Sequence, residues 1–181
     1  MKNYFIQYKP FLVFLGKFLL SYLVFTFIYE SYLNGFDANK YQVDGFTKVV
    51  TNHTVSLLKL FGSDAYYTKN AIEPCMNIYY NQKFMARIIE GCNGLSVIIL
   101  FASFVIAFTG KWLRTVLFII SGSVLIHILN IVRIALLCVL MYYFPAYESV
   151  LHGVIFPLFI YGVVFILWII WVNKFSIYAK N

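Results

Sequence analysis

Four long apolar runs constrain this chain more than any other feature of its sequence. They cover residues 11–29, 94–112, 115–132 and 153–172, and each approaches the roughly 20 residues that an α-helix needs to cross a bilayer. Hydrophobic residues make up 62% of the 181 residues and charged residues only 12%, which excludes an ordinary water-soluble domain. The sequence therefore predicts an all-α integral membrane bundle of about four transmembrane helices in a single domain, residues 1–181.

The segments outside these runs predict three smaller elements. Residues 46–61 place apolar side chains at helical spacing, which predicts a helix lying on the bilayer or on the bundle. Residues 76–90 alternate apolar and polar side chains around a turn at residues 81–83, which predicts a small β-hairpin. Residues 134–144 are apolar but only about 16 Å long as a helix. We expect them to form a short re-entrant or interfacial helix, or an outward continuation of the third span.

The distribution of charge predicts the orientation in the membrane. With four spans both termini lie on one side, and the segments on that side contain only basic charges: Lys2, Lys9, Lys17, Lys111, Arg114, Lys174 and Lys180. Every acidic residue lies on the other side: Glu30, Asp37, Asp44, Asp64, Glu73, Glu90 and Glu148. Because basic loops stay in the cytoplasm, both termini are expected there, and the net charge of +7 reports topology rather than nucleic-acid binding.

Cys92 lies in a turn, residues 90–94, directly before the second apolar run. Asn93 can cap the helix that follows, and the positive end of the helix dipole then favours the reactive thiolate of Cys92. Two other roles stay open for this cysteine: a small buried hydrophobic residue, or a disulfide partner of Cys75 on the same side. Cys138 lies in an apolar stretch without polar neighbours and is expected only to pack.

Arg133 and His152 are predicted at the same membrane depth as this cysteine. Arg133 ends the third run among apolar neighbours, where a guanidinium needs a partner or a task unless it snorkels to lipid headgroups. Asn130, three residues earlier, shares its helix face. His152 opens the fourth run, and its alternative role is an interfacial histidine wetted by headgroups. His127 and His53 are expected to be structural.

Together these residue types supply the parts of a thiol acyl-transfer site. Cys92 would attack a peptide carbonyl, and His152 would take the thiol proton and return it to the leaving amine. Arg133 would stabilise the oxyanion or anchor a carbonyl or carboxylate of the substrate. The sequence contains no pattern typical of a metal site, a P-loop or a dinucleotide site, so no cofactor is expected.

These motifs resemble those of the exosortase and archaeosortase family of multi-pass membrane transpeptidases. Glu90-x-Cys92-x-Gly94 resembles the E-x-C-S-G signature of that family, with Asn93 in place of the usual serine. Asn130-x-x-Arg133 resembles its N-x-x-R element, and His152-Gly153 resembles its third motif, in the same order along the chain. The resemblance covers residues 76–172, and the small size with few spans is similar to the exosortase F branch.

The resemblance implies a cysteine-type sorting enzyme of the bacterial inner membrane with its active site on the extracytoplasmic side. Its substrates would be exported proteins that end in a short motif, a transmembrane helix and a basic cluster. They would be cleaved through a thioester on Cys92 and passed to an amine or to water. The implied catalytic residues are Cys92, Arg133 and His152, and the supporting ones are Glu90, Asn93, Gly94 and Asn130.

One alternative belongs to a different class of protein. In this alternative the chain is a non-enzymatic membrane assembly or transport subunit, in which Arg133 pairs with Glu90 or Glu148 as a structural contact between helices.

Overall fold

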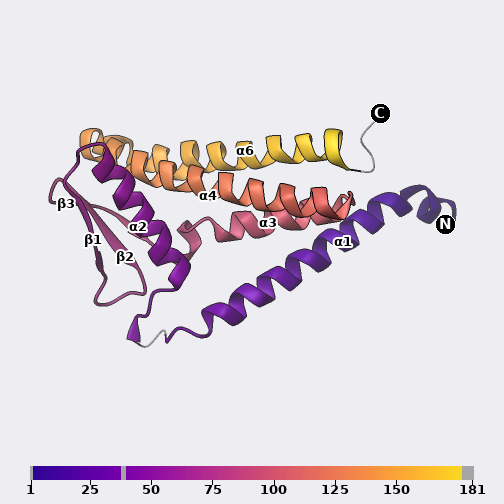
Figure 1. The fold of residues 1–181 in the computed structure, drawn as a ribbon, viewed down its shortest axis with the longest axis horizontal. Coiled ribbons are helices and arrows are strands. Elements are labelled where there is room, and N and C mark those ends of the chain that lie inside the picture. Colours follow the sequence, from indigo (N-terminus) through magenta and orange to yellow (C-terminus); the bar gives the residue numbers. More distant parts are fainter. Residues whose placement is uncertain (1, 38–39, 177–181) are drawn as a thin grey trace.

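The computed structural model describes residues 2–37 and 40–176. Four helices lie along one long axis, and a small sheet with a further helix covers one end of them (Figure 1). The first helix begins and the last helical segment ends at the opposite end from the sheet (Figure 1). This arrangement agrees with an even number of passes. Lys180 and the side chain of Lys2, which the charge argument uses, lie outside the described residues.

The bundle consists of α1 (Lys2–Leu33), α3 (Leu95–Ala107), α4 (Trp112–Tyr143) and α6 (Phe156–Ile170). Among the described residues, three helices are long and apolar enough to cross a membrane: α1, α4 and the helical stretch Pro145–Phe175 that contains α6. The predicted span at 94–112 differs in extent, because α3 has only 13 residues. α3 ends at Ala107, three residues before Gly110, whose backbone pairs with Ser176.

The third predicted span and the short apolar segment after it form one helix. α4 runs unbroken for 32 residues, so the prediction of a re-entrant helix is wrong and its alternative, an outward continuation, is confirmed. No glycine or proline interrupts the chain between Gly122 and Pro145. The outer part of α4 does not need lipid around it, because α2 and the sheet bury its side chains Ile134, Ala135 and Cys138.

The outer layer contains α2 (Gly45–Leu60) and three antiparallel strands in the order β1 (Ala65–Lys69), β2 (Met76–Tyr80) and β3 (Lys83–Ile88). The predicted hairpin is confirmed as β2 and β3, with Asn81 and Gln82 at positive φ in its turn. β1 was not predicted. Ala65 is its only buried side chain, so the alternation that marks a strand is missing from its sequence.

The helix predicted over residues 46–61 is confirmed as α2. Leu60 and Phe61 are each 80% exposed. The helix instead buries a face that is half threonine: Thr47, Val50, Thr51, Thr54, Val55 and Leu58. Thr51 and Thr54 can be buried because their hydroxyls donate to backbone carbonyls one turn earlier.

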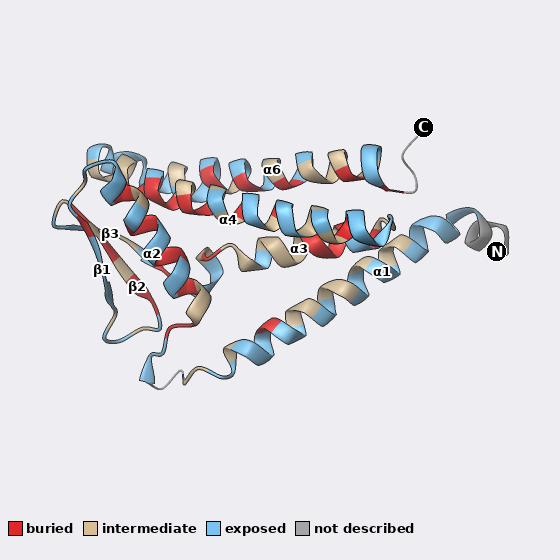
Figure 2. Ribbon diagram, viewed as in Figure 1, coloured by how far each residue is buried: buried red, intermediate tan, exposed pale blue. Residues whose placement is uncertain are grey.

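Two hydrophobic clusters hold the molecule together. One lies between α2, the sheet and the outer part of α4, and the other joins α3, α4 and α6 around Phe101 and Trp171. Figure 2 shows buried residues in both places and a largely exposed α1. A helix with an exposed apolar surface of this kind is typical of a lipid-facing span.

The fourth predicted run forms a single helical segment with two wider turns. α5 (Glu148–Val150) passes into η4 (Leu151–Ile155), which is a π-helical turn, and then into α6. Pro157 has no N–H to donate to the preceding turn, which favours the wider turn there. Such π-helical turns occur often at functional sites, and this one carries His152.

Candidate active site

The turn that carries Cys92 connects the sheet to the bundle. β3 ends at Ile88, a 3₁₀ turn covers Glu90–Cys92, and α3 begins at Leu95. Gly94 has φ +85°, a conformation that side chains with a Cβ rarely adopt. The thiol of Cys92 is partly exposed. The chain therefore changes direction sharply at the cysteine and presents it at the start of a helix.

Asn93 fixes this turn from inside the protein. It is buried, and its Oδ1 accepts a hydrogen bond from the N–H of Leu95 at 2.9 Å. Its Nδ2 donates to the hydroxyls of Tyr29 at 3.3 Å and of Thr47 at 3.2 Å. Asn93 thus bonds to the first residue of α3, although the N-cap position that was expected for it is occupied by Gly94. Asn93 also ties the turn to α1 and α2, a role that sequence reasoning missed.

Asn130 holds the same turn from α4. Its Nδ2 donates to the carbonyl oxygen of Cys92 at 3.2 Å. A Cβ on Gly94 would lie 3.1 Å from the amide of Asn130, so the glycine is needed for this close approach as well as for its φ. Gly94, from the motif that contains Cys92, therefore lies against Asn130, from the motif that contains Arg133.

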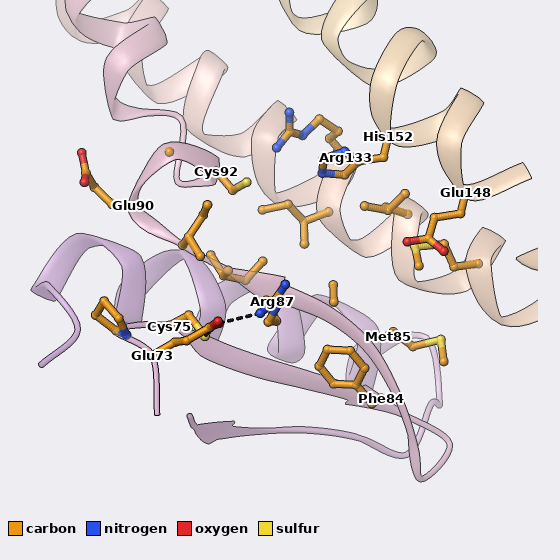
Figure 3. A pocket seen from close by; sticks show the side chains of 18 residues that line it. Glu73, Cys75, Phe84, Met85, Arg87, Glu90, Cys92, Arg133, Glu148 and His152 are labelled. Atoms are coloured by element: carbon orange, nitrogen blue, oxygen red, sulfur yellow. Dashed lines mark hydrogen bonds and ion pairs between the residues drawn. The ribbon is translucent and has the colours of Figure 1, made fainter. Parts of the chain in front are cut away.

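The three residues predicted as catalytic line one cavity of about 750 Å³. Cys92 comes from the turn before α3, Arg133 from α4 and His152 from the π-helical turn. Figure 3 shows Cys92, Arg133 and His152 along one side of the cavity and the side chains of β3 along the other. Arg133 is half-buried and lines the same cavity as Cys92. Residues from three distant parts of the chain therefore face the same space.

Glu90, a predicted supporting residue, lies at the edge of this cavity. Figure 3 shows its carboxylate pointing away from Cys92, and the carboxylate lies near the hydroxyl of Tyr29. Glu90 is therefore connected to the Cys92 turn through Tyr29, whose hydroxyl accepts a hydrogen bond from Asn93.

The ion pairs of the described residues do not include Arg133. They are Lys40 with Asp37, and Arg87 with Glu73 at the edge of the cavity. The structural pairing of Arg133 with Glu90 or Glu148, on which the non-enzymatic alternative rests, is not found here. The guanidinium is instead directed to a cavity that also contains a thiol and an imidazole.

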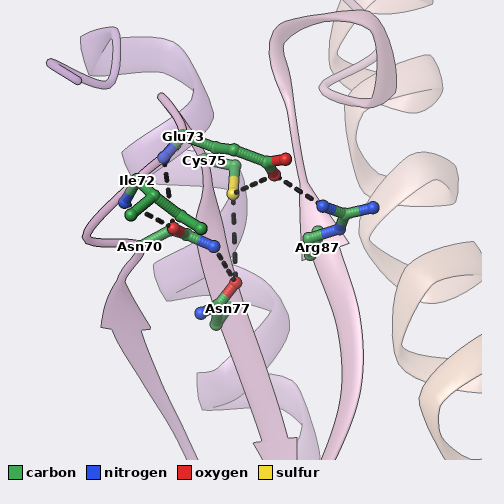
Figure 4. A network of polar contacts seen from close by, with 6 residues as sticks. All are labelled: Asn70, Ile72, Glu73, Cys75, Asn77 and Arg87. Atoms are coloured by element: carbon green, nitrogen blue, oxygen red, sulfur yellow. Dashed lines mark hydrogen bonds and ion pairs between the residues drawn. The ribbon is translucent and has the colours of Figure 1, made fainter.

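Cys75 lines the same cavity but differs from Cys92 in its surroundings. It is fully buried, and its thiol lies 3.8 Å from Glu73 Oε2 and 3.9 Å from Asn77 Oδ1 (Figure 4). Burial, and after it the negative charge of Glu73, raises the pKa of Cys75. All three cysteines are free thiols, so the disulfide between Cys75 and Cys92 is absent from this structure. Cys138 is buried in the outer cluster, as expected.

His53 and His127 form a contact that the sequence did not predict. His53 Nδ1 and His127 Nε2 are 3.2 Å apart, so one nitrogen donates a hydrogen bond and the other accepts it. The pair joins α2 to α4 and does not line the cavity of Cys92. Because the two histidines are 74 positions apart, a single sequence does not indicate that they pair.

A second cavity, of about 690 Å³, lies between α1, α2, α3 and α4. Most of the side chains that line it are apolar: Phe25, Ile28, Tyr29, Tyr32, Phe46, Val49, Leu95, Ile98, Ile99, Ala102 and Ile119, with Ser123 and Gly45. Tyr29 lines this cavity and contacts Asn93, which directly follows Cys92. The buried asparagine therefore lies between the two cavities.

Comparison with known protein families gives one match. The model of a family described as transmembrane exosortase matches residues 11–173, which is most of the chain. No curated protein and no solved structure matches the chain. The family match and the apolar helices together show a membrane protein. The exosortase F branch stays a prediction.

Proposed function

Because the chain belongs to the transmembrane exosortase family, we propose that it is a membrane-embedded cysteine transpeptidase that cleaves C-terminal sorting signals of exported proteins. The observation that carries the proposal is the single cavity into which Cys92, Arg133 and His152 project from three separate elements. A thiol, an imidazole and a guanidinium around one space are the groups that acyl transfer requires.

Acylation follows from the chemistry of these side chains. His152 takes the proton of the Cys92 thiol, and the sulfur attacks the carbonyl carbon of a substrate peptide bond. The C–N bond then breaks, the leaving amine receives the proton from His152, and the acyl group stays on Cys92 as a thioester. An amine acceptor or water attacks the thioester, gives its proton to His152, and releases the thiol.

Arg133 acts on the charge that develops during this attack. Its planar donors suit an oxyanion, and its half-buried position in the cavity directs them to one place. Asn130, Asn93 and Gly94 serve as positioning residues, because they hold the Cys92 turn and do not themselves present a group to the reacting bond.

The substrates are exported proteins that carry a short motif, a transmembrane helix and a basic cluster. A substrate helix beside the bundle would bring the motif to the level of the cavity, and confinement to the membrane plane would supply part of the orientation. The enzyme lies in the bacterial inner membrane, with both termini in the cytoplasm and the cavity on the outer side.

The decisive experiment combines Cys92→Ala with trapping of the acyl-enzyme. The wild-type chain is co-expressed with an exported reporter protein that ends in such a tripartite tail, and cleavage is followed by the mass of the reporter. We expect Cys92→Ala to abolish cleavage and the wild-type enzyme to yield a reporter adduct on Cys92. The mass of that adduct identifies the cleaved bond.

The controls are His127→Ala and Cys138→Ser, which change the same residue types at positions outside the cavity. Both variants should accumulate in the membrane and cleave the reporter. Normal cleavage by Cys92→Ala would reject the proposal and favour the non-enzymatic membrane subunit.

A further inference from the structure

Strand β3 is an edge strand, and its free edge faces the cavity of Cys92. From this arrangement we propose that the substrate binds as an added β-strand along β3, in an extended conformation that delivers the scissile bond to Cys92. The inference rests on the proposed function, because it names the binding mode of the same substrate. In this binding mode the backbone N–H and C=O groups of β3 bind the peptide, beside the side chains of Cys92, Arg133 and His152.

The direction of the backbone groups in β2 can be read from the bonds at its two ends. The N–H of Asn81 donates to Asp64 at 2.7 Å, and the carbonyl of Cys75 accepts from Asn70 at 3.0 Å. Both contacts lie on the side of β1. Because this direction alternates along a strand, the odd-numbered residues of β2 face β1 and the even-numbered ones face β3.

The register then shows which groups of β3 are free. Ala86 and Ile88 lie opposite the even-numbered Ile78 and Met76, so their backbone groups bond to β2. Arg87 lies between them, opposite Asn77, and its N–H and C=O point to the free edge. Within residues 2–37 and 40–176, no backbone hydrogen bond outside the sheet involves residues 84–88.

This free edge continues to the cysteine. All residues from Phe84 to Cys92 line the cavity. Ile89 is extended, with φ −103° and ψ 168°. Its carbonyl accepts a hydrogen bond from the N–H of Cys92 at 3.0 Å. Among the described residues, no backbone hydrogen bond uses the N–H of Ile89, so this N–H is available to a ligand. A peptide that pairs with Arg87 and Ile89 therefore reaches the thiol within a few residues, at about 3.3 Å per residue.

The surroundings of this edge fit one peptide strand and exclude a folded sheet. Exposed edges normally invite pairing with another chain, and proteins protect them. Here α4 and the start of the fourth helical segment close the space opposite β3, with Ile134, Leu137 and His152 on that side. A second copy of this chain would have to bring its whole sheet into a cavity of about 750 Å³. A single extended segment needs no more than one strand's width, about 4.8 Å from β3.

The geometry also gives the orientation and the side-chain preference of the substrate. β3 runs from its outer turn towards α3, and an exported protein with a membrane-embedded tail runs in the same direction. The residues before the scissile bond would therefore lie parallel to β3. Alternate side chains of that segment face the apolar Ile134 and Leu137 of α4, whereas those between them face the open side.

The test on the enzyme removes one backbone donor. Arg87→Pro deletes the N–H that faces the cavity, whereas Arg87→Ala removes only the side chain and its exposed ion pair with Glu73. We expect Arg87→Pro to slow reporter cleavage about tenfold and Arg87→Ala to slow it less than about twofold. An edge strand tolerates proline where the N–H points away from the sheet.

The matched control lies on the other edge of the same sheet. Tyr67 pairs with Ile78, whose backbone groups face β3, so the N–H of Tyr67 points away from β2. Tyr67→Pro therefore makes the same chemical change far from the cavity and should leave cleavage at the wild-type rate. Equal rates for Arg87→Pro and Arg87→Ala in folded protein would overturn the inference.

A second measurement leaves the enzyme untouched. Proline is placed in turn at each of the five reporter residues before the cleaved bond. Strand addition predicts losses at every second position, because only alternate N–H groups of the substrate face β3. Uniform losses, or none, would contradict strand addition. In either case Cys92→Ala would still report on the proposed function separately.

Discussion

Two cavities of similar volume lie on either side of the turn that carries Cys92, and their walls differ in chemistry. The first, about 750 Å³, combines apolar side chains with a thiol, a guanidinium, an imidazole and the free edge of a strand. The second, about 690 Å³, is almost entirely apolar. Size alone therefore does not favour one cavity over the other as the candidate site. What distinguishes the first is the convergence of polar groups from elements far apart in the sequence.

The buried Asn93 lies between these cavities and links them. It bonds to Tyr29 and Thr47 on the side of the second cavity, and it directly follows Cys92 on the side of the first. A hydrogen-bonded asparagine can be buried here at little cost because its amide has partners on α1 and α2. The turn that contains Cys92 and Asn93 therefore separates a cavity with polar groups from a cavity with almost entirely apolar walls.

The largest expected effect tests whether the charge in the first cavity takes part in the reaction. Arg133→Ala should reduce the initial rate of reporter cleavage about 100-fold or more, because the developing oxyanion loses its donors. Arg133→Lys keeps the charge but lacks the planar pair of donors, so it should restore only part of the rate. Rates are compared per amount of enzyme in the membrane, and wild-type activity of Arg133→Ala would remove the arginine from the mechanism.

A smaller effect is expected from the turn between the cavities. Gly94→Ala forces a Cβ into a left-handed conformation, at a cost of roughly 1–2 kcal/mol, and brings it to 3.1 Å from Asn130. We expect about a tenfold slower reaction, measured with the same reporter. Gly91→Ala is the matched control, because no atom lies within 4 Å of a Cβ there. Identical rates for the two variants would show that the turn does not need to be rigid.

A change of several-fold is expected in the reactivity of the second thiol of the first cavity. Cys75 has a raised pKa, so less of it is thiolate at neutral pH than for an ordinary thiol, and its maleimide labelling should rise only at alkaline pH. Glu73→Gln removes a negative charge that raises this pKa, so labelling at a fixed pH should become faster. The measurement uses a variant in which Cys75 is the only cysteine. An unchanged labelling rate of Cys75 in the Glu73→Gln variant would contradict this effect of the Glu73 charge.

The smallest effect is expected in the second cavity. Ile28→Trp places a bulky side chain there and should change reporter cleavage less than about twofold, since Ile28 is 58% exposed and has space around it. Met141→Trp makes a comparable change in the first cavity and should slow cleavage clearly, because it takes space from the substrate. A large loss with Ile28→Trp would assign substrate binding to the second cavity as well.

The extent to which the site was predictable differs from residue to residue. Cys92, Arg133 and His152, which line one cavity, could be proposed together from the sequence because their residue types are unusual at the ends of apolar runs, and hydropathy indicates that depth. The roles of Tyr29 and Thr47 were not identified, because a tyrosine or a threonine near a membrane surface is common and their contact to Asn93 depends on packing. The pairing of His53 with His127 was missed for the same reason.

The fold shows the same division. The hairpin and α2 follow from local periodicity, whereas β1 pairs through its backbone and carries one buried side chain, so its sequence shows no pattern. For the short segment after the third apolar run, the sequence left a re-entrant or interfacial helix and an outward continuation of the third span open, and the continuation is observed; the re-entrant helix was predicted because the segment is too short to span. The re-entrant helix is not observed. Its prediction compared the length of the segment with the thickness of a bilayer, whereas in the structure α2 and the sheet, rather than lipid, bury this part of α4.

The sequence by itself determined the membrane class and singled out Cys92, Arg133 and His152 as candidates, because hydropathy and residue chemistry are local properties. Only the tertiary structure decided that these side chains share a cavity, that Asn130 bonds to the backbone of Cys92, and that the free edge of β3 leads to the thiol. Such relations depend on which faces of distant elements pack together, and packing is a property of the whole chain.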